Sequence, residues 1–269
     1  MKRLFAVALL TAVSAGAQDL SAFEKILFPV LAADALHGAN GTLFQTRLLA
    51  SLTEPVAFYP ATTSGAPSTG LQPAGVDFVR YFEAAPRSGG RLLYFDRSKT
   101  SEVSFFFELD VTGPDGSVHR TTMPVVRERN FERGPSVIVG LTTAVKYARD
   151  VFPPQFVGFG SRNHIRVYDV DNTGSLNVRV RVTNAALLAY GPFAEYQVPV
   201  ATRDGVDASY PYYVDIALAD LCITAPTGNL CRDFGLDVSI EPSDSGARYW
   251  AFASATDNTS GETSVFYPQ

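Results

Sequence analysis

The chain of 269 residues is 46% apolar and 18% charged, which provides enough apolar material for the core of one large or two ordinary domains. Its formal charge of −5 lacks the basic footprint of a nucleic-acid-binding protein, so we exclude nucleic acid as a partner. After residue 17, no segment is apolar for long enough to cross a membrane as a helix, and we expect no transmembrane segment in the mature chain.

Residues 1–17 have the pattern of a secretory signal peptide. Met1-Lys2-Arg3 is a positive start, Leu4–Val13 is an apolar run, and Ala15-Gly16-Ala17 is a small-residue cleavage pattern that places the cut before Gln18. The apolar run is shorter than the roughly 20 residues that span a bilayer, which disfavours a permanent anchor. We therefore expect a secreted protein, located outside the cell or in a periplasm.

The first half of the mature chain is predicted to be β-structure, because apolar residues alternate with polar ones over short segments. The clearest pair is Val103–Val111 and Val118–Val126, joined by a turn at Gly113-Pro114-Asp115-Gly116, which predicts a hairpin. One helix signal stands before these strands, a short turn that Ser21 and Glu24 are placed to cap. Further strands are predicted at residues 42–50, 56–59, 78–83, 91–95 and 137–141.

A change of composition at Val151-Phe152-Pro153-Pro154 is interpreted as a domain boundary, because two prolines disfavour a central strand. A second series of strands follows, of which Leu176–Thr183 has the strictest alternation. We therefore predict an all-β protein of two tandem antiparallel β-sandwiches, with residues 18–152 as the first domain, including an N-terminal extension, and 153–269 as the second. The other strands of the second series are predicted at residues 164–168, 194–200, 212–218, 236–241, 248–255 and 263–267.

Cys222 and Cys231 are predicted to form a disulfide. They flank a turn-rich stretch with Pro226, Gly228 and Asn229, and an exported protein matures in an oxidising compartment. A zinc site is disfavoured because two thiols are an incomplete ligand set, and a redox dithiol is disfavoured because the spacing is not Cys-x-x-Cys.

Asp169, Asp171 and Thr173, followed by Gly174, have the alternate oxygen donors with which a calcium loop begins. The twelfth position of such a loop would require a bidentate glutamate, but Val180 stands there, inside the strongest predicted strand. The simpler interpretation is a hairpin turn in which Asn172 and Gly174 adopt the tight backbone angles. We expect no cofactor, with calcium at this loop as the alternative.

No catalytic constellation is evident. His37, His119 and His164 are scattered, and no Gly-x-Ser-x-Gly segment is present. Glu108 and Asp110 share a strand face at a separation that resembles a glycosidase pair, but a solvated strand face carries acidic residues routinely. We therefore predict no catalytic residues and no enzymatic activity.

Aromatic residues gather at Tyr210, Tyr212 and Tyr213 and again at Tyr249-Trp250-Ala251-Phe252. Exposed rings stack well on sugars, whereas large rings in a sandwich core bury well, and alternation places some of these rings in the core. Tyr212, Tyr213 and Trp250 are the candidate ligand-stacking residues.

A resemblance to a known group of proteins is carried by three segments, Phe23–Val30, Gly41–Leu48 and Tyr249–Asn258. These segments resemble parts of secreted bacterial proteins that are built from tandem immunoglobulin-like sandwiches and are themselves largely uncharacterised. A fainter likeness is present at Arg166-Val167-Tyr168-Asp169. The resemblance implies the layout of two sandwiches and supplies no catalytic residues.

These observations predict a secreted or envelope-associated interaction or adhesion module without enzymatic activity, which offers exposed loops and strand edges to a protein or a polysaccharide at the cell surface. One alternative is a carbohydrate-binding module, which requires exposed, coplanar rings. A glycoside hydrolase requires two carboxylates facing each other across a cleft. An outer-membrane β-barrel is disfavoured by the single tryptophan, the 17 prolines and the mixed-charge strand faces.

Overall fold

The structure is a computed structural model, and it describes residues 20–32, 35–52, 58–60, 89–143, 145–148, 155–184, 192, 194–206, 208–218, 223–225, 228–230 and 234–268. Over these ranges the protein is almost entirely β, every strand pair is antiparallel, and no helix is long and apolar enough to cross a membrane. The predicted signal peptide, Cys222 and Cys231 lie outside the described residues. The only helices in the described ranges are short 3-10 turns, η1 (Leu20–Ala22), η2 (Ala39–Gly41), η4 (Arg97–Glu102) and η5 (Glu128–Asn130).

Two four-stranded sheets are built mainly from the first half of the chain. The predicted hairpin is confirmed as far as Thr122, because β6 (Val103–Thr112) pairs with β7 (Val118–Thr122) around a turn in which Gly116 has a φ of 81°. The predicted second strand is too long, because Val126 lies in β8, which pairs with β1 in the other sheet. One sheet has the order β4 (Phe58–Pro60), β5 (Arg91–Asp96), β1 (Phe23–Phe28), β8 (Val126–Arg127), and the other has the order β2 (Leu36–His37), β3 (Leu43–Leu52), β6 (Val103–Thr112), β7 (Val118–Thr122).

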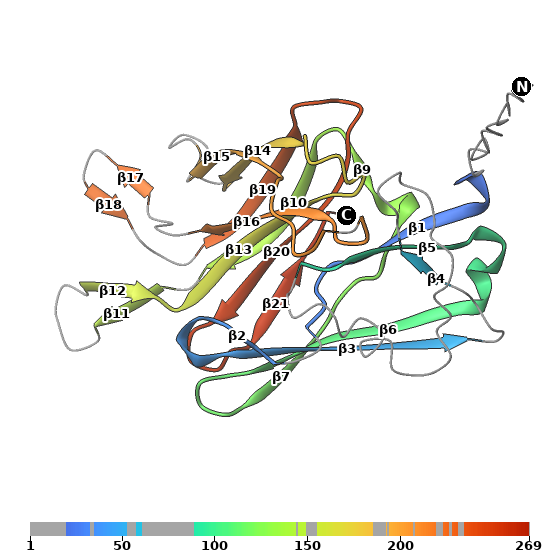
Figure 1. Cartoon of the computed structure of the whole chain (residues 1–269). Coiled ribbons are helices and arrows are strands. Elements are labelled where there is room, and N and C mark those ends of the chain that lie inside the picture. Colours follow the sequence, from blue (N-terminus) through green and yellow to red (C-terminus); the bar gives the residue numbers. More distant parts are fainter. Residues whose placement is uncertain are drawn as a thin grey trace, which may run out of the picture.

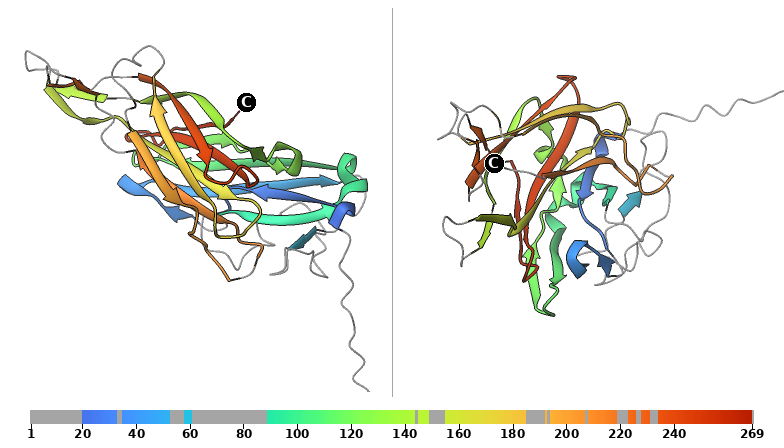
Figure 2. Two further views of the ribbon diagram at one scale, coloured as in Figure 1. Left: turned by 90° about the horizontal axis from the view of Figure 1, so that it is seen from above. Right: turned by 90° about the vertical axis from the view of Figure 1, so that its left-hand side faces the viewer.

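Two further sheets, one of five strands and one of four, are built mainly from the second half of the chain. The middle sheet has the order β16 (Tyr212–Leu218), β13 (Ser161–Asp169), β20 (Arg248–Asp257), β21 (Thr263–Phe266), with β9 (Glu132–Arg133) also paired to β20. The outer sheet has the order β10 (Ser136–Thr143), β19 (Phe234–Pro242), β14 (Asn177–Thr183), β15 (Ala194–Pro199). Two small hairpins, β11 (Val145–Ala148) with β12 (Gln155–Phe159) and β17 (Ile223–Ala225) with β18 (Gly228–Leu230), project at one end of the molecule (Figures 1 and 2).

The middle sheet contributes to two hydrophobic cores, one on each face. The first core lies between the middle sheet and β1, β3, β5 and β6, and the second core lies between the middle sheet and the outer sheet. Because side chains alternate along a strand, Tyr168 of β13 is buried in the first core, whereas Ile165 and Val167 are buried in the second. On β20, Ala251 and Ala253 face the second core while Trp250 and Phe252 face the first. Figure 1 shows β13 and β20 crossing the middle of the molecule.

The domain boundary expected after residue 152 does not separate the strands of the first two sheets from those of the middle and outer sheets. β9 and β10 precede that boundary, yet β9 pairs with β20 and β10 pairs with β19. The physical reason is burial, because Ile138 and Leu141 of β10 are fully buried in the second core. A composition change marks a connection along the chain but does not determine which sheet a strand joins.

The helix signal at the start of the chain is wrong in its position. The described turn is η1, which ends at Ala22, and Glu24 lies in β1, where it does not act as a cap. The Glu24 carboxylate instead accepts hydrogen bonds from the Arg127 guanidinium, Nε to Oε1 at 2.9 Å and Nη2 to Oε2 at 2.8 Å. A bidentate partner 103 residues away in the sequence therefore determines the role of Glu24.

Candidate ligand-binding site

A cavity of about 510 Å³ lies between the middle sheet and the sheet that contains β2, β3 and β6. This volume is within the range of small-molecule sites, and such sites combine apolar walls with a few polar groups. Its apolar lining includes Val30, Leu36, Phe44, Met123, Phe252 and Val265. Its polar and charged lining includes Arg162, His164, Arg166, Asp204, Tyr213 and Asp215.

The strand register explains why these polar groups meet on the floor of the cavity. Residues two apart on a strand share a face, so Arg162, His164 and Arg166 of β13 all point away from the second core. The residues that pair with these three across the sheet point to the same face, so the neighbouring strands extend it in three rows. The rows are Asp215, Arg166 and Phe252; Ala217, His164 and Ser254; and Arg162, Thr256 and Thr263.

Asp215 joins His164 and Arg166 into one ionic cluster. Arg166 Nη2 lies 2.5 Å from Asp215 Oδ2, and His164 Nδ1 lies 3.6 Å from Asp215 Oδ1. Burial opposes ionisation of Asp215, but His164 and Arg166 beside it outweigh that effect and lower its pKa from 3.8 to about 2. The carboxylate is therefore ionised at neutral pH and is occupied by donors of the protein itself.

The Asp215→Asn variant is expected to be less stable than the unmodified protein by about 0.5–1 kcal/mol at pH 7, since the carboxylate is partly exposed to solvent. The folded-state pKa is below the unfolded value, so this contribution is present above about pH 4 and is lost as the pH falls toward 2. Urea unfolding of both proteins from pH 7 to pH 2 measures the difference. A gap that stays constant over this range would contradict the assignment.

Asp204 and Tyr213 form a second polar pair at the cavity. The Tyr213 hydroxyl donates to Asp204 Oδ1 at 2.8 Å, and the Gly89 backbone N–H donates to Asp204 Oδ2 at 2.7 Å. Burial and the adjacent Asp204 raise the pKa of Tyr213 to about 12, so its hydroxyl is protonated at neutral pH. The Arg166 guanidinium lies 5.0 Å from the centre of the Tyr213 ring, within the range of a cation–π interaction.

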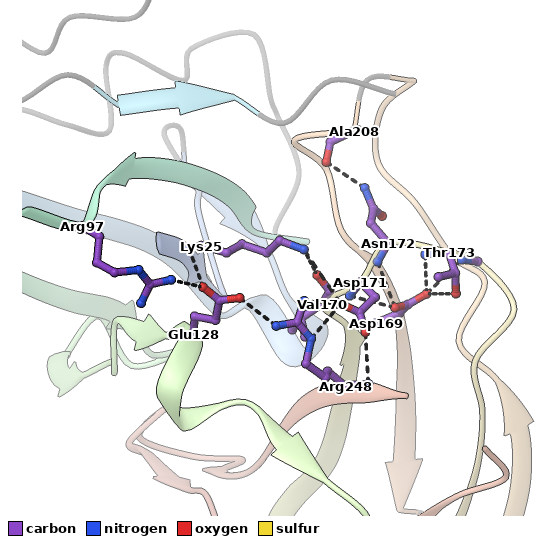
Figure 3. A network of polar contacts seen from close by, with 11 residues as sticks. Lys25, Arg97, Glu128, Asp169, Val170, Asp171, Asn172, Thr173, Ala208 and Arg248 are labelled. Carbon is purple, nitrogen blue, oxygen red and sulfur yellow. Dashed lines mark hydrogen bonds and ion pairs between the residues drawn. The ribbon is translucent and has the colours of Figure 1, made fainter. Parts of the chain in front are cut away.

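The turn proposed as a calcium loop is organised by the Asp169 carboxylate (Figure 3). Oδ1 accepts the Asn172 N–H at 2.9 Å, and Oδ2 accepts the N–H groups of Thr173 at 2.8 Å and Gly174 at 2.9 Å as well as the Thr173 hydroxyl at 2.8 Å. The tight angles are confirmed, with φ of 59° at Asn172 and 69° at Gly174. The turn is not a hairpin, however, because β13 and β14 belong to different sheets.

Asp171 takes part in an ionic network that connects this turn to β1 and η5 (Figure 3). Arg248 donates from Nη2 to Asp171 Oδ1 at 2.6 Å and from Nη1 to Glu128 Oε1 at 2.7 Å. Lys25 Nζ donates to the Val170 carbonyl at 2.8 Å and lies 4.0 Å from Asp171 Oδ1. Burial lowers the pKa of Lys25, and the charge of Asp171 partly offsets that effect. The network ties together segments from both halves of the chain.

The three candidate stacking rings lie in different surroundings. Trp250 is only 4% exposed and stacks on Tyr168 with ring centres 6.2 Å apart, inside the first core. Tyr212 is half-buried, with the Arg203 guanidinium 4.9 Å from its ring centre. Tyr213 alone among the three lines the cavity, so the rings do not form one exposed platform.

Glu108 and Asp110 lie side by side on the outer face of β6. Arg120 Nε is 3.2 Å from Glu108 Oε2 and 2.7 Å from Asp110 Oδ1, and Arg47 Nη1 is 3.6 Å from Glu108 Oε2. The two carboxylates share one cation on one strand, rather than facing each other across a cleft.

The structure brings two of the three histidines together, since His37 and His164 both line the cavity, while His119 Nε2 lies 3.1 Å from the Ser117 hydroxyl. Sequence analysis missed Arg162, Arg166, Asp204 and Asp215. The alternation Arg162, His164, Arg166 was a usable signal, because charged side chains at every second position predict one polar face on an otherwise apolar strand. Among the described residues, no group of three His, Cys, Asp or Glu is placed to hold a metal ion.

Comparison with protein-family models, with curated proteins and with solved structures finds nothing that matches this chain.

Proposed function

We propose that this chain is an exported, non-enzymatic binding protein, built from immunoglobulin-like β-sandwiches, that takes its ligand in the cavity between the middle sheet and β2, β3 and β6. The observation that carries this proposal is the cavity itself, with its volume of about 510 Å³ and its mixed lining. Asp204 and Asp215 are each held by donors of the protein, which favours binding over general acid–base chemistry.

The proposal includes the export signal at residues 1–17 and the Cys222–Cys231 disulfide in an oxidising compartment. The small hairpin between the cysteines supports the disulfide. Ile223, which follows Cys222, pairs with Leu230, which precedes Cys231.

The test is saturable binding by the purified mature chain to a panel of polysaccharides, cell-envelope fractions and small organic acids, with calcium and with a chelator. Ser254→Trp is the decisive variant, because Ser254 lines the cavity and pairs with His164, so a large ring there fills the space. We expect it to abolish binding. Gln197→Trp is the matched control, since Gln197 is exposed on β15 of the outer sheet.

If the Ser254→Trp variant still binds the ligand, the cavity is not the binding site, and binding is then assigned to exposed loops and strand edges. Binding of a neutral polysaccharide that is lost in Ser254→Trp would identify a carbohydrate-binding module. Such a module would use Tyr213, the one candidate stacking ring that lines the cavity.

A further inference from the structure

Among the described residues, no carboxylate forms an ion pair with Arg162, in contrast to Arg166 of the same cavity. Arg162 Nη1 donates to Asn258 Oδ1 at 3.1 Å, and its Nη2 donates to Thr42 Oγ1 at 3.3 Å, so both acceptors are neutral. It forms no ion pair with a carboxylate of the described residues, and burial lowers its pKa, an effect that the nearby charge of Asp257 only partly offsets. A guanidinium has five N–H donors, and two hydrogen bonds leave donors available to a ligand.

The other charged groups of the cavity have partners within the protein, although only Asp215 and Arg166 neutralise each other. Asp215 is paired with Arg166 at 2.5 Å, and Asp204 accepts the Tyr213 hydroxyl and the Gly89 N–H. The two arginines and two aspartates of the cavity balance in formal charge, so an anion is favoured only locally, at Arg162, which forms no ion pair with a described carboxylate.

The two acceptors of Arg162 also hold its guanidinium in place. Asn258 Oδ1 accepts a further hydrogen bond from Asn40 Nδ2 at 3.3 Å, and Thr42 is fully buried, with its hydroxyl donating to the Ala39 carbonyl at 2.8 Å. A cation fixed in this way loses little freedom when a ligand binds, which is a requirement of a preorganised site.

The shape of the cavity limits the rest of the ligand. Arg162 and Arg166 stand four residues apart on β13, which corresponds to about 13 Å along the strand. The wall near the Arg166 row includes Phe252, and the row between them includes Val265 opposite Ser254. The site thus offers a cation at one end, and Val265 and Phe252 provide apolar contacts beside the polar residues along its length.

We propose that the cavity binds a small organic monocarboxylate, with its carboxylate on Arg162 and its apolar body along Val265 and Phe252. This inference rests on the proposed function. A guanidinium matches a carboxylate through two parallel N–H donors. A dianion such as a phosphate monoester fits less well, because Asp204 and Asp215 line the same cavity and repel a second negative charge.

The experiment compares two acids with their neutral amides, octanoate with octanamide and phenylacetate with phenylacetamide, by isothermal titration calorimetry on the full mature chain at pH 7. We expect at least one acid to bind with one site per chain and about tenfold more tightly than its amide. In Arg162→Gln we expect the acid to lose about tenfold in affinity while the affinity of the amide changes less than about twofold. Arg162→Lys should restore part of the loss, because it keeps the charge without the planar donors.

Arg179→Gln is the matched control. It removes the same charge from β14 in the outer sheet, where Arg179 pairs with Glu195 and Glu241, and it should leave acid binding unchanged. Equal affinity for an acid and its amide, or undiminished acid binding in Arg162→Gln, would overturn the inference.

The result with Ser254→Trp separates this inference from the proposed function. If a different ligand binds and Ser254→Trp removes that binding while no monocarboxylate binds, the proposed function stands and this inference fails. If acid binding persists in Ser254→Trp, the cavity is not the site and both fail.

Discussion

Replacement of Asp169 by alanine is expected to lower the free energy of unfolding by about 3–5 kcal/mol. The carboxylate is 2% exposed and accepts hydrogen bonds from the backbone N–H groups of Asn172, Thr173 and Gly174. Each hydrogen bond to a charged group contributes about 1.5–3 kcal/mol, and the contributions are less than additive. Without the carboxylate, the turn between the middle and outer sheets loses the acceptor for its backbone donors. Urea unfolding at neutral pH measures the loss.

Asp169→Asn and Thr173→Ala are graded controls. The amide keeps one acceptor oxygen and should retain part of the stability, and Thr173→Ala removes only the hydroxyl bond, at a cost of about 1 kcal/mol. The same series in calcium and in chelator tests the alternative role of this loop. If Asp169→Ala in chelator is as stable as the unmodified protein in chelator, and calcium stabilises only the latter, then Asp169 is a calcium ligand.

Replacement of Trp250 by alanine is expected to cost about 3–5 kcal/mol, as is typical when a large buried ring is removed from a core. The ring is 4% exposed and lies 6.2 Å from the Tyr168 ring and 5.6 Å from the Phe252 ring, measured between centres. Phe252 lines the cavity, whereas Trp250 does not. The substitution therefore affects the ligand site only if Phe252 repacks into the space that the Trp250 ring leaves. Thermal unfolding monitored by circular dichroism measures the effect.

Tyr213→Phe is the informative partner of that variant. It removes the hydroxyl bond to Asp204 but keeps the ring that lines the cavity, so we expect a cost of about 1 kcal/mol and a folded protein. A Trp250→Ala protein that keeps its stability but loses ligand binding would contradict the placement of Trp250 in the core and would assign it a stacking role.

The positions of the strands were predictable where one face of a strand is exposed to solvent and the other is buried. Leu176–Thr183 was expected to alternate, and β14 buries Val178, Val180 and Val182 while Arg179 and Arg181 face outward to glutamates. Period-two alternation is a local property, so it can be read from a single sequence. The pairing of strands is not local. Nothing in residues 136–143 indicates that β10 pairs with β19, almost one hundred positions away.

The same limit explains why the site was missed. His164 was noticed as a single histidine and Asp215 was not noticed at all, because they become neighbours only when β13 pairs with β16. Arg162 stands out only by contrast with Arg166, which forms an ion pair with Asp215, whereas no described carboxylate pairs with Arg162. Which charged side chains form ion pairs is a property of the folded protein, so it cannot be predicted from the composition of the sequence or the spacing of its residues.

The alternation along β13 separates two kinds of evolutionary constraint. Ile165 and Val167 hold the second core, whereas Arg162, His164 and Arg166 on the other face meet the cavity. A descendant of this protein could exchange the charged triplet and so change what it recognises, while the intervening residues preserve the architecture. From residue 162 to residue 167 of this strand, the odd positions Ile165 and Val167 preserve the fold, whereas the even positions are free to change specificity.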